Sequence, residues 1–138
     1  MNDTHLALRF AVAIGLGILL GLERERTKGG DGGAGVRTFA LIALSGAMAG
    51  YLGQNLELIW LALAVFVAVA ALIVGMYVVT AQRGDTGITT EVSALLAFLL
   101  GLLCTYGQLQ LASWIAVAMA LLLALKDWLH QFASRINS

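Results

Sequence analysis

The sequence contains no proline, a single cysteine (Cys104) and only two histidines. Without proline, no helix can be kinked by that residue, and one cysteine cannot form a disulfide within the chain. His5 and His130 lie far apart in the sequence and have no other candidate ligands nearby, so we predict neither a zinc site nor a hydrolytic centre. We therefore do not expect an enzyme.

Charged residues are scarce as well. They make up 12% of the chain, whereas soluble domains contain roughly 25%, and 60% of the residues are hydrophobic. The formal net charge is zero, so the composition does not predict a nucleic-acid partner. This composition predicts an integral membrane protein whose main partner is the lipid bilayer.

Long apolar runs predict an all-α polytopic membrane protein. A helix needs about 20 mostly apolar residues to cross a bilayer, and buried β-strands would need breaks about every 4–8 residues, which are missing. We expect one membrane domain over residues 1–138, a bundle of five transmembrane helices. The predicted spans are residues 6–22, 36–53, 58–81, 88–106 and 109–125.

The placement of Lys and Arg predicts the orientation of the bundle. Basic residues follow the first, third and fifth predicted spans, whereas the connections at residues 54–57 and 107–108 contain none. Because cytoplasmic loops are enriched in Lys and Arg, we expect the N-terminus outside and the C-terminus in the cytoplasm. Arg9 lies near the outer start of the first span, where its side chain can reach the interface.

Small residues recur at four-residue spacing, which allows helices in a membrane to approach closely. We predict that six of them pack helices: Gly17, Gly21, Gly46, Gly50, Ala116 and Ala120. Two interpretations stay open, namely packing within the bundle or the seam of a homodimer. The alanine stripe from Ala112 to Ala124 is the strongest candidate for such a seam, and we expect a homo-oligomer because five helices form a small bundle.

Charge concentrates after the first predicted span, where seven of the sixteen charged residues lie between Glu23 and Arg37. A helix favours cations at its C-terminus and anions at its N-terminus, so Arg24 suits its position whereas Glu23 and Arg37 do not. The glycine-rich segment at residues 29–35 lets the two helix ends meet. We therefore predict a folded lid in which Glu23 pairs with Arg37.

The predicted start of the fourth span adds hydroxyl and carboxylate oxygens on the same side, including those of Asp85 and Thr86. Mg²⁺ accepts such hard oxygen ligands and usually retains waters. The candidate cation-binding residues are Glu23, Glu91, Thr90 and Thr38, with Glu23 and Glu91 as the metal ligands. Arg24 and Arg37 would supply orienting charge. The alternative is structural: Thr90 caps the helix, Glu91 complements its dipole, and the cations only set topology.

Three segments carry a resemblance to a known family: GILLGLERERTKGG (17–30), AGVRTFALIALSGAMAGYLG (34–53) and GDTGITTEVSALLAFLLGLLCTYGQ (84–108). They resemble the N-terminal membrane domain of the MgtC/SapB family, over about residues 6–125. The family motif falls on Gly21, Leu22, Glu23, Arg24, Gly35, Arg37, Thr38, Gly87, Thr89 and Thr90. The resemblance implies a multi-pass protein of the bacterial inner membrane.

The resemblance also implies two classes of function. The first is transport or homeostasis of Mg²⁺ or another cation, with Mg²⁺ as the candidate ligand. The second is a regulatory membrane protein that binds another membrane complex, such as the ATP synthase, and transports nothing. Glu91 replaces the small residue of many members and resembles a subgroup that carries a second hydrophobic half. Because the chain ends at Ser138 without that half, we expect a homodimer in parallel orientation.

Overall fold

The computed structural model describes residues 3–28, 35–82 and 89–136. These residues form five α-helices and no β-strand: α1 Asp3–Lys28, α2 Val36–Asn55, α3 Ile59–Gln82, α4 Thr89–Thr105 and α5 Leu109–Ile136. The prediction of an all-α chain is confirmed. Most of the predicted glycine-rich lid, with Asp31, and the positions of Asp85, Thr86 and Gly87 lie outside the described residues.

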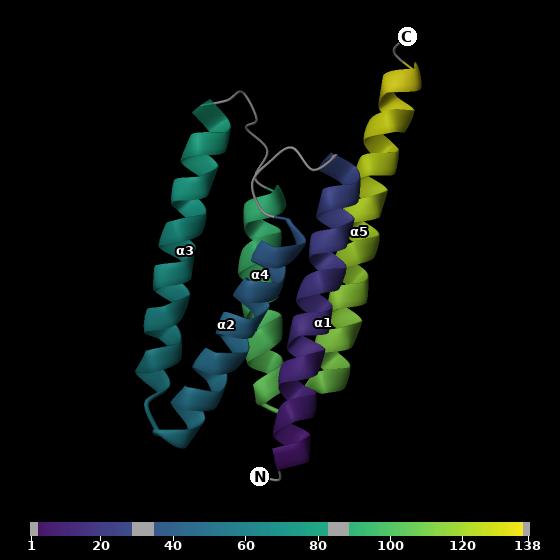
Figure 1. Cartoon of the computed structure of the whole chain (residues 1–138). Coiled ribbons are helices and arrows are strands. Elements are labelled where there is room, and N and C mark those ends of the chain that lie inside the picture. Colours follow the sequence, from purple (N-terminus) through teal and green to yellow (C-terminus); the bar gives the residue numbers. More distant parts are fainter. Residues whose placement is uncertain (1–2, 29–34, 83–88, 137–138) are drawn as a thin grey trace.

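Successive helices run in alternating directions, so that α1 ends at the same end of the bundle at which α2 and α4 begin (Figure 1). We call this the charged end, because it carries residues 23–26 of α1. The helix α4 lies in the middle and contacts all four other helices. Ten of its 17 residues are buried. The helix α3 lies at the edge and packs only against α2 and α4.

Four helices of the described chain are long and apolar enough to cross a membrane: Asp3–Arg26, Val36–Asn55, Ile59–Val79 and Leu109–Ile136. The helix α4 is shorter, and its 17 residues span about 26 Å at 1.5 Å per residue. A bilayer core is about 30 Å thick. Because α4 packs against all four other helices and most of its residues are buried, its ends do not have to match the lipid boundary.

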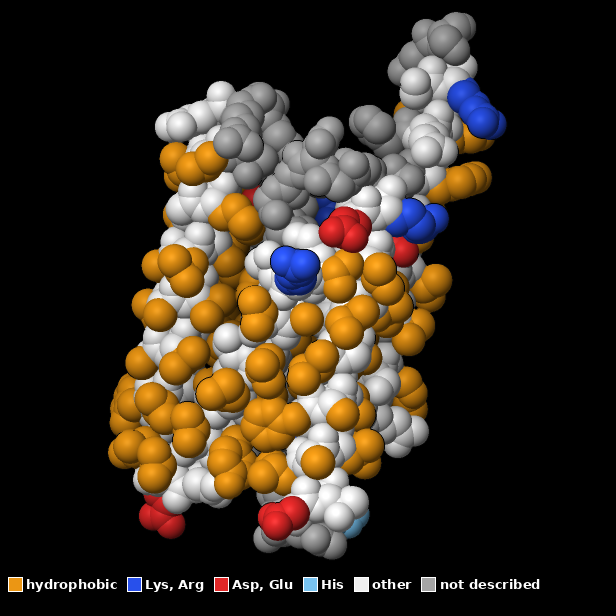
Figure 2. All heavy atoms as spheres, in the orientation of Figure 1, with side chains coloured by type: hydrophobic (Ala, Val, Ile, Leu, Met, Phe, Trp, Pro, Cys, Tyr) orange, Lys and Arg blue, Asp and Glu red, His pale blue; other side chains and the backbone are white. Residues whose placement is uncertain are grey.

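The outer surface is apolar, as expected of a chain dissolved in lipid. Figure 2 shows hydrophobic side chains over the middle of the visible face and charged side chains toward its two ends. On α3, Trp60 is 74% exposed and Leu72 is 75% exposed. Water would penalise such surface strongly, whereas lipid tails solvate it.

The helices α2 and α4 approach each other through two glycines that fit against the opposite backbone. A Cβ atom on Gly46 would lie 2.0 Å from the carbonyl oxygen of Phe98, and one on Gly101 would lie 2.0 Å from that of Ala43. Both distances are far below van der Waals contact. No side chain larger than hydrogen therefore fits at either position unless the two helices separate.

Other small residues set the remaining contacts inside the bundle. Gly17 and Gly21 of α1 lie against the backbone of α2, and Gly50 of α2 lies against the hydroxyl of Thr105. On α5, Ala112 and Ala116 are fully buried within the chain, and Ala120 is half-buried. Ala112 and Ala116 therefore pack within the bundle, the first of the two interpretations of the stripe, and the homodimer stays a prediction.

Both connections at the end opposite the charged end close in the same way. The amide of Gln108 donates to the carbonyl of Leu103, and Gly107 adopts a positive φ of 83°. This is the Schellman arrangement, in which glycine favours the left-handed position. After α2, Glu57 occupies the equivalent position with φ 53°. This left-handed conformation is less favourable for Glu57 than for glycine, because the Cβ atom crowds the following carbonyl oxygen.

Arg9 completes the last turn of α4 at this end. Its Nη1 atom donates to the carbonyl oxygen of Thr105 at 2.9 Å. The last carbonyls of a helix lack partners within the helix and favour a cation. Arg9 therefore holds α1 to the C-terminal end of α4, a contact that its place in the sequence did not predict.

We expect Gly101→Ala to lower the free energy of unfolding by about 3 kcal/mol or more, because overpacking forces α2 and α4 apart. Gly75→Ala is the matched control, since a Cβ atom there meets nothing within 4 Å. Its effect should stay within about 1 kcal/mol. Circular dichroism during denaturation in detergent measures both, and equal stabilities would contradict the close approach of the two helices.

Candidate functional site

Polar side chains of α1 and α4 meet inside the bundle at the charged end. Arg24 lies in the last turns of α1, and Thr90 and Glu91 lie in the first turn of α4. All three are buried, with exposed fractions of 6%, 4% and 9%. Because α4 is the central helix, the part of its first turn that carries Thr90 and Glu91 lies among the other helices.

Thr90 accepts two hydrogen bonds from Arg24. The Nε atom of Arg24 lies 3.2 Å from Oγ1 of Thr90, and its Nη2 atom lies 2.8 Å from the same oxygen. The planar guanidinium presents these donors in a fixed fork, so the pair fixes the rotation of α1 relative to α4. The contact is a structural anchor and also places a positive charge inside the bundle.

Glu91 is the unusual residue of the site. Its Oε2 atom is buried and has no hydrogen-bond partner among the described residues. An unpaired buried carboxylate oxygen is costly, and such an atom calls for an explanation such as a ligand or an ion. The first turn of α4 therefore presents a buried acceptor that the described part of the protein does not use.

The helical repeat shows toward which helices Glu91 is turned. Glu91 and Phe98 are seven residues apart and thus share one face of α4. The ring of Phe98 packs against that of Phe66 on α3, with centroids 5.5 Å apart, and its carbonyl lies against Gly46 of α2. Glu91 therefore lies on the side of α4 that faces α2 and α3, whereas Thr90 is turned to α1.

Arg24 and Glu91 are the charged residues in the buried part of the described chain. Their charges are opposite, and Thr90, which contacts the guanidinium, directly precedes Glu91 in the chain. The site as a whole is therefore neutral, with a positive group held by hydrogen bonds and a carboxylate oxygen left available. Such an arrangement can accept a proton donor or a cation at Glu91.

Glu23 forms an ion pair along its own helix. Its Oε1 atom pairs with Nη2 of Arg26 at 2.6 Å, one turn along the same helix. Arg37 is exposed and forms no ion pair with a described residue. The predicted contact between Glu23 and Arg37 is thus not found in the described part of the chain. The pair that replaces it is a surface pair and contributes little to stability.

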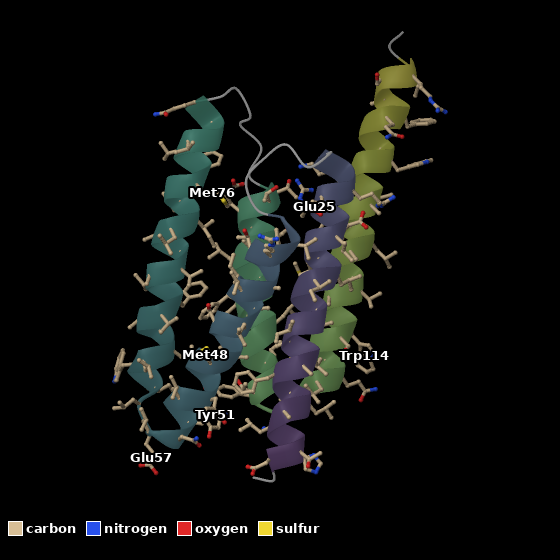
Figure 3. All side chains as sticks on the ribbon, viewed as in Figure 1. Glu25, Met48, Tyr51, Glu57, Met76 and Trp114 are labelled. Carbon is tan, nitrogen blue, oxygen red and sulfur yellow. The ribbon has the colours of Figure 1, made fainter. Side chains whose placement is uncertain are left out.

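Thr38 lines a groove between α2 and α3. The groove has a volume of about 270 Å³ and is lined by Thr38, Leu41, Ile42, Ser45, Val69, Leu72, Ile73 and Met76. In Figure 3, Met76 points from α3 toward α2 and α4. Of the four predicted cation ligands, Thr90 and Glu91 are buried in the first turn of α4, whereas Glu23 and Thr38 are partly exposed.

Glu25 of α1 was not predicted as a site residue, yet its side chain lies beside the start of α2. Its Oε1 atom would be 2.7 Å from a Cβ atom on Gly35, the residue that precedes α2. A negative charge at a helix N-terminus is favourable. Figure 3 shows Glu25 at the charged end and Glu57 at the opposite end of the bundle. In the sequence, the corresponding signal is an acidic residue near the end of one predicted span and a glycine directly before the next.

The described residues contain no group of three or more His, Cys, Asp and Glu side chains that could hold a metal ion. Mg²⁺, however, is commonly held through one or two carboxylates while several waters remain on the ion. Glu91 can supply one carboxylate. A Mg²⁺ ion held by this one carboxylate would keep most of its waters.

Comparison with known proteins gives one match. A family model described as the MgtC family matches residues 10–132. No curated protein and no solved structure matches the chain. The predicted resemblance is therefore confirmed over most of the sequence.

We expect Thr90→Val to lower the free energy of unfolding by about 2 kcal/mol or more, because two donors of a buried guanidinium lose their acceptor. Thr90→Ser keeps the hydroxyl oxygen and is the matched control, with a smaller loss. Denaturant titration of the purified variants measures the difference. If the valine and serine variants were equally stable, the contact between Arg24 and Thr90 would not anchor α1 to α4.

Proposed function

We propose a function from one premise: this chain belongs to the MgtC family, whose model covers residues 10–132. Membership and the apolar helices make it a multi-pass membrane protein related to Mg²⁺ homeostasis. We place it in the bacterial inner membrane, with all five helices crossing. The remaining task is to assign the residues that handle the cation.

The proposed orientation puts the charged end in the cytoplasm. The charged end carries Arg24, Arg26 and Arg37, and α5 runs past it with Lys126 and Arg135. Because Lys and Arg are retained on the cytoplasmic side, the N-terminus lies outside. The candidate site then opens toward the cytoplasm.

Glu91 is the proposed cation-facing residue, and Mg²⁺ is the proposed cargo. The observation that carries this assignment is the buried Oε2 atom without a hydrogen-bond partner among the described residues. A hydrated Mg²⁺ could use this oxygen and keep its remaining waters. The positive charge of Arg24 weakens such binding, which suits an ion that has to leave again.

Arg24 and Thr90 have positioning roles in this proposal. The guanidinium is held by Thr90 and neutralises the buried charge of Glu91 when no cation is bound. Glu23 is already paired with Arg26 at the surface and is not needed. The geometry thus shifts the proposed site from Glu23 to Glu91.

We expect Glu91→Gln to reduce Mg²⁺ uptake into proteoliposomes at least tenfold, measured with an enclosed Mg²⁺-sensitive dye. Glu23→Gln removes the same charge one helix away and should stay within twofold of the wild type. The absence of Mg²⁺ flux and Mg²⁺ binding in the wild type would discard the cation proposal. Equal losses of Mg²⁺ uptake in both variants would show that the effect is not specific to Glu91.

The orientation has its own test, in a Cys104→Ala background. Gln54→Cys, in the last turn of α2, and Gln108→Cys, between α4 and α5, place thiols on exposed residues opposite the charged end. An impermeant maleimide should label both in intact cells. Gln82→Cys and Gln131→Cys, at the charged end, should react only after the cells are opened. The reverse pattern would invert the proposed topology.

The regulatory alternative and the parallel homodimer stay predictions. A regulatory protein would keep its effect on a partner complex in the Glu91→Gln variant. A cation transporter would instead lose its Mg²⁺ flux in this variant. Because Ala112 and Ala116 are buried within the chain, a dimer needs another surface than the alanine stripe. Crosslinking from exposed positions of α3 and α5 would locate that surface.

A further inference from the structure

A second groove lies between α4 and α5, on a part of the molecule that the proposed cation site does not use. Its volume is about 320 Å³, and it is lined by Thr89, Val92, Ser93, Leu96, Met119, Leu122, Leu123 and Lys126. The polar residues are not scattered evenly. Thr89 and Lys126 lie together at one end of the groove, and the side chains beyond Ser93 are all apolar.

The lining of the groove therefore matches an amphiphile, because it is polar at one end and apolar along the rest. From Thr89 to Leu96 it follows α4 for seven residues, or about 10 Å at 1.5 Å per residue. At its charged end stands the ammonium group of Lys126, which donates a hydrogen bond to Oγ1 of Thr89. A molecule with an anionic head and an alkyl chain matches this sequence of surfaces.

Lys126 is available to such an anion. Its ammonium group has three donors, of which the bond to Thr89 uses one. It is exposed and forms no ion pair with any residue that the structure describes. Glu91, the nearest carboxylate in the sequence of α4, lies two residues from both Thr89 and Ser93, about 200° around the helix. It is therefore turned away from the groove.

The depth of Lys126 in the membrane also fits. It lies 17 residues after the first residue of α5, Leu109, or about 26 Å along the helix. A hydrocarbon core is about 30 Å thick. With α5 crossing the bilayer, the ammonium group reaches the level of the lipid headgroups while the apolar part of the groove stays among the acyl chains.

We propose that this groove binds one anionic phospholipid of the cytoplasmic leaflet. Its phosphate lies on the ammonium group of Lys126, and one acyl chain runs along Leu96 and Met119. Acyl chains alone give no preference, because the surrounding lipid offers the same contacts. The headgroup charge decides the selectivity. The groove between α2 and α3 has similar size but no charged residue in its lining.

The test compares two lipids with identical acyl chains, phosphatidylglycerol and phosphatidylcholine, mixed equally in detergent micelles with the purified chain. Native mass spectrometry gives the ratio of the two bound lipids. We expect about a fivefold preference for phosphatidylglycerol, the effect of one lysine near an anionic headgroup. In Lys126→Gln the ratio should fall to about one.

Arg135→Gln is the matched control, because Arg135 belongs to the same helix, has the same charge and does not line the groove. It should keep the preference of the wild type. Equal binding of both lipids by the wild type would overturn the proposal, and so would an equal loss in Arg135→Gln, which would indicate diffuse attraction. Displacement of the lipid by millimolar inorganic phosphate would also overturn it, since the groove would then recognise a free anion.

Discussion

The contact between α2 and α4 is the constraint on which the rest of the bundle depends. Lipid gives helices no hydrophobic reason to associate, so the bundle relies on backbones that approach within atomic contact. Gly46 and Gly101 provide this approach from both sides. With α4 held in the centre, its first turn carries Thr90 and Glu91 into the interior, and its last carbonyls come within reach of Arg9.

The number and type of helices could be predicted, because a run of about 20 apolar residues has few other solutions in a membrane. Their ends were less predictable. The helix α5 continues from the predicted end at residue 125 to Ile136, since a helix with polar residues is also stable outside the lipid. The small residues of the stripes could be identified as contacts, but their spacing alone does not say which helix lies opposite.

The choice of ionic partners could not be predicted, because it depends on how α1 is rotated about its axis. Adjacent residues of a helix point about 100° apart. That angle turns Arg24 to Thr90 and leaves Glu23 with Arg26. The charges of Glu23 and Arg24 and their positions in the sequence do not depend on this rotation, so the sequence cannot reveal it. The carboxylate of Glu91 was identifiable as a candidate, whereas its burial required the packing of four helices around α4.

The central position of α4 has a consequence for biogenesis. This helix is fourth in the chain but contacts all the others, so α1, α2 and α3 enter the membrane before the element around which they pack. Until α4 is synthesised, Arg24 has no Thr90 to hold it and the glycines of α2 face lipid. The contacts of α4 that make up the core therefore form only after α4, with Glu91 in its first turn, has been synthesised.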